Sequence, residues 1–216
     1  MNIHLPASTF SEVLPALAQG LLAPLDSWDG ETTIEVPPAV GGGAISAVRF
    51  YDGLSLLRWQ VNLNEAVTMY VAPTDHHPLR LMLCAQGSVG HAIDAYRLYE
   101  LASHHYSLSV CSGYVDQHFC LPAHQSLRLY MVEIDRTVYE SRLPFPPGDG
   151  PHSLTPIFFD TFAPDPFLYR SAYNSLIGAA LQELEESRFQ GLARHTFLEA
   201  KTLELLSLAL QQYVKR

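Results

Sequence analysis

Histidine is the residue whose number and clustering in this sequence first suggest chemistry. The 216 residues contain ten histidines, including the adjacent pairs His76-His77 and His104-His105. Imidazole nitrogens bind transition metals, but a site needs several ligands that converge on one point. Adjacent strand residues point to opposite faces, so neither pair would place both rings in one pocket. A His-x-His spacing would do so and is absent. We therefore expect loop or structural roles for these histidines and no metal site.

Other catalytic motifs are also missing from the sequence. It contains no GxSxG nucleophile motif, no HExxH zinc motif and no glycine-rich loop that opens a helix. Gly41-Gly42-Gly43 precedes a strand pattern, whereas a phosphate-binding loop would precede a helix. We expect no enzymatic activity and no cofactor.

Aromatic residues indicate a binding site more strongly. The chain has eleven Tyr, ten Phe and two Trp, and many of them lie in or beside predicted strands. Ligand pockets are mostly apolar with a few polar groups that fix orientation, and Tyr and Trp supply both. Core packing explains any single aromatic residue, but the set indicates a small-molecule cavity. The candidate ligand-binding residues are Arg58, Trp59, Tyr70, Arg80, Tyr96, Tyr106, His118 and Tyr130.

Strands are the elements that would position these residues. From Ala44 to about Ile134 the apolar residues have the period of two that is typical of strands, with turn residues at short intervals. A helix is predicted before them, within residues 1–30. About eight short strands predict a sandwich or small barrel. Their ranges are 45–50, 54–63, 67–72, 79–86, 95–101, 106–112, 117–121 and 127–134.

The chain changes character after the last of these strands. Six Pro and Gly residues between positions 144 and 151 mark a connector. Asp165 followed by Pro166 has the pattern of a helix N-cap and first helical position, and Gly191 predicts a break before a last helix. We therefore predict a β domain over residues 1–150 and an antiparallel helical pair over residues 151–216.

The last predicted helix has one broad apolar face and is free of Gly and Pro. The face is wider than one neighbouring helix needs, which predicts pairing with a second copy of the chain. The candidate dimerisation residues are Leu198, Leu205, Leu206, Ala209 and Tyr213.

The same helix resembles a known family. The segment Leu198-Glu-Ala-Lys-Thr-Leu-Glu-Leu-Leu206 is similar to the linker helix of AraC-type transcription regulators, in the branch that includes siderophore-responsive members. In that family the helix follows a cupin-like (jelly-roll or double-stranded β-helix) sensor barrel and precedes a DNA-binding module of two helix-turn-helix units. The resemblance implies a mainly β fold with C-terminal helices and an effector bound within or at the mouth of the barrel. It covers none of the DNA-reading half.

Composition limits the partners. Hydrophobic residues make up 48% and charged residues 16%, as in folded domains. The net charge of -9 argues against direct contact with nucleic acid. No segment has the pattern of a signal peptide or a membrane span. Three cysteines without a CxxC spacing are typical of a reducing cytoplasm.

Three functions follow as hypotheses. The first is an effector-sensing domain of a transcription regulator that forms a homodimer and relays occupancy through its helices. The second is a metal-dependent cupin enzyme of the isomerase or dioxygenase type, which metal analysis of the purified protein would reveal. The third is a dimerisation module with a filled barrel, which ligand-induced thermal stabilisation would contradict. A siderophore, a sugar and an aromatic acid all remain open as the effector.

Overall fold

A computed structural model describes residues 1–6, 10–50, 53–72, 78–93, 97–110, 116–141, 154–158 and 166–215. Several predicted features lie outside these residues. They are Tyr96, the pair His76-His77, the connector around residues 144–151 and the cap at Asp165.

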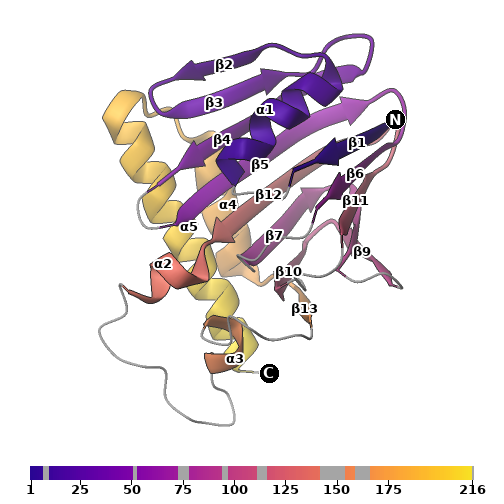
Figure 1. Cartoon of the computed structure of the whole chain (residues 1–216). Coiled ribbons are helices and arrows are strands. Elements are labelled where there is room, and N and C mark those ends of the chain that lie inside the picture. Colours follow the sequence, from indigo (N-terminus) through magenta and orange to yellow (C-terminus); the bar gives the residue numbers. More distant parts are fainter. Residues whose placement is uncertain are drawn as a thin grey trace.

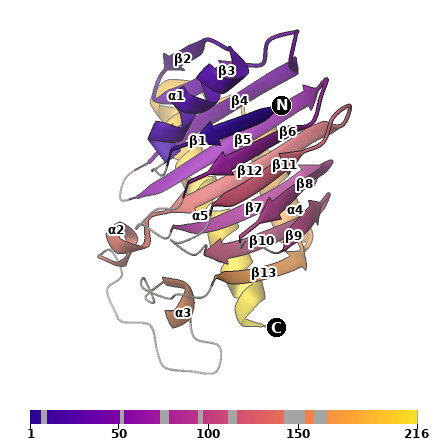
Figure 2. The same cartoon turned by 45° about the vertical axis from the view of Figure 1, so that its right-hand side comes forward.

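Within the described residues the strands form two facing sheets. The larger sheet has the order β13-β10-β7-β12-β5-β4-β3-β2, and the smaller sheet has the order β1-β6-β11-β8-β9. Figure 2 shows the smaller sheet in front of the larger one, so that together they enclose a barrel. The strands of the larger sheet are β2 (Leu25–Trp28), β3 (Glu31–Glu35), β4 (Gly41–Arg49), β5 (Leu54–Leu63), β7 (Leu79–Gln86), β10 (His105–Val110), β12 (Ser126–Ile134) and β13 (Phe167–Ala172). Those of the smaller sheet are β1 (Asn2–Leu5), β6 (Val67–Val71), β8 (Ser88–Ala92), β9 (Leu98–Ala102) and β11 (Gln117–Leu121).

The central strands of the larger sheet are buried on both faces, as strand β7 illustrates. Leu79, Leu81 and Leu83 belong to one hydrophobic cluster, which the helices share. Met82 and Cys84 belong to the other, which fills the barrel. Because successive side chains of a strand alternate between faces, the sheet separates two cores. Figure 1 shows α4 and α5 along the face opposite the smaller sheet.

Five helices occur in the described residues. The predicted N-terminal helix is confirmed as α1 (Phe10–Leu21), which buries Leu14, Leu17 and Leu21. The predicted C-terminal pair is also confirmed. Its members are α4 (Ser175–Glu186) and α5 (Gly191–Val214), and they contact each other along their length. Two shorter helices are α2 (Arg136–Glu140) and α3 (Thr155–Phe158).

The start of the first helix of this pair was predicted wrongly. Residues 167–172 form strand β13, which pairs antiparallel with β10 over its whole length. The helix begins at Ser175 instead, where the Asn174 side chain accepts hydrogen bonds from the backbone N–H groups of Leu176 and Ile177, each at 3.1 Å. The unpaired edge of β10 supplies six backbone partners, and this tertiary pairing outweighs the local helical pattern.

Other strands were missed because they are short or begin at a turn signal. Strands β1, β2 and β3 lie in residues 1–35, where a helix and loops were expected. Gly87 has a φ of 82° and turns the chain, and β8 begins directly after it at Ser88.

Candidate functional site

The described candidate ligand-binding residues do not converge on one cavity. They divide among the barrel interior, the layer between the larger sheet and the helices, and the outer face of the smaller sheet. Trp59 and Arg80 lie on the inner face of the barrel; Arg58, Tyr106 and Tyr130 face the helices; Tyr70 and His118 lie outside.

The two outer residues belong to an aromatic row on the smaller sheet. The Tyr70 ring stacks on His4 with a centroid separation of 4.9 Å and meets His118 edge-on at 4.6 Å. Tyr70 and His118 alternate along their strands with the buried residues Met69 and Phe119. They therefore point away from the barrel, and neither lines its interior.

The two tyrosines on the helix side attach the helices to the sheet. The Tyr106 hydroxyl donates to the backbone oxygen of Ala209 at 3.2 Å, and the Tyr130 hydroxyl donates to Glu185 Oε1 at 2.6 Å. Burial, followed by the hydrogen bond and charge of Glu185, raises the pKa of Tyr130 well above its usual range. Both phenols stay protonated and act as structural donors.

One end of the barrel interior carries buried polar side chains, which we call the polar layer. In the larger sheet, register pairs Ser109 with Arg80, Arg80 with Glu133, and Glu133 with Ser55, which gives one row across four strands. The smaller sheet adds residues that reach this row. Every member occupies one of the first two or last two positions of its strand. The members are Ser55, Arg80, His91, Ser109, Gln117 and Glu133, all at most 8% exposed.

The next rows into the barrel are almost entirely apolar. Register aligns Ser107, Met82, Met131 and Leu57 directly beside the polar layer. Trp59 lies one row further along. The polar layer is therefore a cap of hydrogen-bonding groups over a hydrocarbon interior.

The charges of the polar layer compensate each other. Arg80 Nε donates to Glu133 Oε2 at 2.8 Å, and Arg80 Nη1 donates to Gln117 Oε1. A buried ion pair of this kind needs its further hydrogen bonds satisfied, and Gln117 supplies one of them. Among the described residues of the layer, one positive and one negative charge leave no net charge.

His91 is a titratable member of the polar layer whose pKa is strongly lowered. Its ring is 2% exposed and stacks on Phe119 with centroids 4.4 Å apart. Burial and, after it, the charge of Arg80 lower the pKa of His91 to about 3, although a hydrogen bond with Gln117 opposes the shift. The imidazole is therefore neutral at physiological pH.

Three buried atoms around the layer lack a hydrogen-bond partner in the described part of the chain. They are His91 Nε2, Ser107 Oγ and Ser109 Oγ. Trp59 Nε1 deeper in the barrel is a fourth. Buried polar atoms without partners are rare, and each costs about 1–3 kcal/mol. Three of the seven such atoms in the described residues therefore lie at one end of the barrel.

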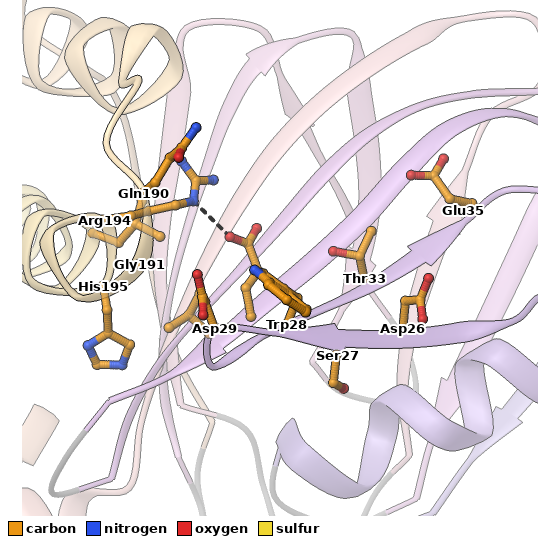
Figure 3. Close-up of a pocket in the computed structure, with 13 residues that line it drawn as sticks. Asp26, Ser27, Trp28, Asp29, Thr33, Glu35, Gln190, Gly191, Arg194 and His195 are labelled. Atoms are coloured by element: carbon orange, nitrogen blue, oxygen red, sulfur yellow. Dashed lines mark hydrogen bonds and ion pairs between the residues drawn. The ribbon is translucent and has the colours of Figure 1, made fainter.

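A groove of about 740 Å³ lies outside the barrel, between the β2–β3 hairpin and the start of α5. Asp29 and Gly30 form the hairpin turn with φ values of 50° and 78°, as a two-residue type I′ turn requires. In Figure 3, Trp28 and Asp29 face Arg194 and His195 across the groove. An adjoining cavity of about 300 Å³ shares Arg194 with it and continues between the sheet and the helices.

Two carboxylates fasten the helical pair to the sheet beside these cavities. Glu31 of β3 accepts from Arg58 of β5 and, at 2.9 Å, from Arg194 Nε of α5. The dashed line that starts at Arg194 in Figure 3 marks the second of these bonds. We call this group the Glu31 clasp. Glu185 of α4 accepts from Arg128 Nη1 at 2.8 Å, besides the Tyr130 hydroxyl.

Electrostatics keeps the Glu31 clasp ionised. Burial alone would raise the pKa of the Glu31 carboxyl, but the hydrogen bond from Arg194 and the charges of Arg58 and Arg194 outweigh it and lower the pKa. Arg58 precedes Trp59 on β5, and strand alternation places the first against the helices and the second inside the barrel.

The described histidines form no metal centre. No group of three or more His, Cys, Asp or Glu lies close enough to hold an ion within the residues that the structure covers. His104 occupies the exposed turn between β9 and β10 with a φ of 63°, and His105 begins β10. Of the loop or structural roles predicted for these histidines, His104 therefore has a loop position and His105 a strand position.

The candidate dimerisation residues require a correction. Leu198, Leu205, Leu206, Ala209 and Tyr213 are each at most 5% exposed, and they pack against the larger sheet of the same chain. A second copy cannot reach them while α5 stays in place. Near the start of α5, the side chains of Phe189 and Leu192 are instead 51% and 81% exposed. The ring centroids of Phe189 and Phe197 lie 5.0 Å apart.

Comparison with known proteins gives a family and a fold. The family described as the regulatory protein PchR N-terminal domain matches residues 42–216. The crystal structure of the AraC-like transcriptional activator CuxR is similar over 87% of this chain and 62% of that one, with a TM-score of 0.50 and 8% identity. Apo ToxT K231A from Vibrio cholerae is similar over 74% and 57%, with a TM-score of 0.48 and 10% identity. Bacterial pirin YhhW from Escherichia coli, solved with nickel(II), is similar over 70% and 55%, with a TM-score of 0.32 and 8% identity.

The likeness to CuxR supports the predicted fold, a mainly β domain followed by C-terminal helices. The chain spans about three fifths of the length of CuxR and ToxT. No curated protein sequence matches it significantly. None of the described helices is long and apolar enough to cross a membrane.

Proposed function

The chain belongs to the family of the regulatory protein PchR N-terminal domain, and from this premise we propose that it senses an effector for an AraC-type transcription regulator. A small molecule binds in the barrel, the chain forms a homodimer, and the helical pair relays occupancy to the rest of the regulator. DNA contact falls to another part of that regulator, because a net charge of -9 disfavours phosphate.

The observation that carries this proposal is the polar layer. Core positions of a barrel without a ligand are best filled with apolar side chains, since buried polar atoms without partners are costly. Here His91, Ser107 and Ser109 each hold such an atom in the barrel interior. A ligand with matching polar groups would form hydrogen bonds with these atoms and would be held in one orientation by them.

The Glu31 clasp supports the relay. It joins strands β3 and β5 of the barrel to the first turn of α5. An effector transmits a signal only if it binds one arrangement of the domain more tightly than another. Repacking around Trp59 would displace its neighbour Arg58 on the same strand, and this would shift the balance between a closed and an open clasp.

The dimer is proposed to use the exposed side of the helical pair. Phe189 and Leu192 present apolar surface next to Phe197 at the start of α5. Exposed apolar clusters of this kind are typical of contact surfaces. The same helix would then touch the barrel with one face and the second copy with the other.

Tryptophan fluorescence tests effector binding, because the two tryptophans of the chain lie at different places. Trp28 is 81% exposed in the outer groove, whereas Trp59 is 4% exposed in the barrel. In a Trp28→Phe variant we expect candidate siderophores, sugars or aromatic acids that act as effectors to change Trp59 emission saturably and to raise the unfolding temperature. In the matched Trp59→Phe variant, the emission of Trp28 should stay constant.

The two variants also separate the alternatives. A response confined to Trp28 would place the effector in the outer groove. If neither variant responds to any candidate and the unfolding temperature does not change, the chain is better described as a dimerisation module with a filled barrel.

A further inference from the structure

We infer that the polar layer receives an uncharged, hydroxyl-bearing group of the ligand, and not a carboxylate or an ammonium group. This inference rests on the proposed sensing function, because it names the chemistry that the barrel site recognises. It excludes ligands that place a carboxylate or an ammonium group in the polar layer. The argument comes from the charges, the hydrogen-bonding atoms and the neighbouring row of the barrel.

Within the described residues, the positive charge of Arg80 and the negative charge of Glu133 already balance each other in the layer. Arg80 is 5% exposed, and Glu133 and Gln117 both accept from its guanidinium. A ligand carboxylate beside this pair would have to compete with Glu133 for the same cation. A ligand ammonium would have to compete with Arg80 for the same anion. A buried charge without its own partner is strongly unfavourable, so either ion is disfavoured.

The unpartnered atoms favour a group that can both donate and accept. Ser107 Oγ and Ser109 Oγ are hydroxyls, and each can donate one hydrogen bond and accept others. His91 is neutral, so its Nε2 either donates or accepts according to the tautomer. A ligand hydroxyl matches these atoms in either case. A carboxylate accepts only, and an ammonium donates only.

The apolar row beside the layer defines the rest of the ligand. Met82, Met131 and Leu57 lie next to it and are at most 6% exposed. Methionine side chains are flexible and adapt to apolar shapes. The part of the ligand that follows the hydroxyl group into the barrel is therefore apolar.

Methionine NMR on the full chain tests this with two probes of similar size, trans-1,2-cyclohexanediol and cyclohexanecarboxylate. The chain has four methionines, and the methyl signals of Met82 and Met131 report on the row below the layer. Met1 lies at the N-terminus, directly before β1, and its methyl signal serves as the reference for the shifts of the other two. We expect the diol to shift Met82 and Met131 saturably, with an affinity at least about tenfold higher than that of the carboxylate.

Two variants connect the shifts to the layer. Ser109→Ala removes one unpartnered hydroxyl with little change in volume and should weaken the diol about tenfold. Ser126→Ala, at the exposed opposite end of β12, should leave the diol affinity unchanged. Unfolding curves of both variants establish that each one folds.

The outcomes distinguish failure of this inference from failure of the proposed function. If the carboxylate shifts Met82 and Met131 as strongly as the diol, the site binds ligands but the proposed chemical class is wrong. Equal diol affinity in Ser109→Ala and the unmodified chain would also overturn the class. If neither probe moves the two signals at millimolar concentration, the layer is closed to ligands and the barrel site itself fails.

Discussion

We expect the free energy of unfolding to fall as the pH decreases from about 8 to about 4.5, with His91 as a principal cause. The pKa of this imidazole is about 3 in the folded chain, compared with a usual value of 6.5. The unfolded chain therefore binds the proton first, and acid favours unfolding between these two values. The stability that neutral His91 contributes is intact above 6.5 and is lost progressively below it. The loss should reach about 1.4 kcal/mol at about pH 5.5 and about 2.7 kcal/mol at about pH 4.5.

Urea unfolding at several pH values, compared with His91→Gln, measures this effect. Glutamine keeps a polar side chain but cannot take up a proton, so the difference between the two curves isolates the histidine. The pKa of Glu31 is lowered in the folded chain, so its carboxylate stabilises the fold at pH values above 4.5, its usual pKa. This stabilisation is lost as the pH falls below 4.5, and the loss is equal in both proteins. Parallel curves for the two proteins between about pH 8 and about pH 4.5 would refute the reasoning. They would mean that the His91 ring is accessible to protons in the folded state and that the polar layer is open to solvent.

Two further predictions concern the helices. Leu206→Asp places a charge at a position that is 3% exposed and should destabilise the fold by about 3–5 kcal/mol. Leu192→Asp changes a side chain that is 81% exposed, so it should weaken the dimer and leave the unfolding temperature unchanged. Circular dichroism and sedimentation velocity check both, and a Leu192→Asp protein that still sediments as a dimer would contradict the proposed surface. Glu31→Gln should accelerate amide exchange in residues 191–198 at least about tenfold by opening the clasp, and Glu35→Gln in the same groove should not. Unaltered exchange in the Glu31 variant would mean that packing alone holds the start of α5.

Strands with unambiguous alternation are predictable from the sequence, whereas β13 is not, because its pattern fits two periods. Strand β5 was predicted with its observed bounds because apolar and polar residues alternate along its second half. In residues 167–172, Leu168 and Ala172 are four apart, as on a helix, whereas Phe167 and Tyr169 are two apart, as on a strand. Local sequence cannot choose between these readings. The choice depends on the free edge of β10, which is distant in the sequence.

The composition of the polar layer could be predicted only in part, for a related reason. Arg80 was a candidate, but His91, Ser109 and Glu133 were not. Whether a polar residue in a strand faces solvent or the core depends on the register of several strands. A signal was nevertheless present: Ser109 and Glu133 each lie between two apolar residues of a strand. If both faces of a sheet are covered, such a residue has no solvent to face and must find polar partners inside.

The same double burial explains where the apolar face of the last helix goes. Six consecutive residues of β7, from Leu79 to Cys84, are buried, so the larger sheet needs a cover on the side away from the barrel. Helix α5 supplies that cover with the face that was predicted to meet a second copy. What remains for a partner is the smaller exposed patch around Leu192, at the start of the helix. Because the Glu31 clasp holds the first turn of α5 on the sheet, a shift of this helix relative to the barrel would move the patch with it. A ligand in the barrel could therefore alter the proposed dimer contact without touching it.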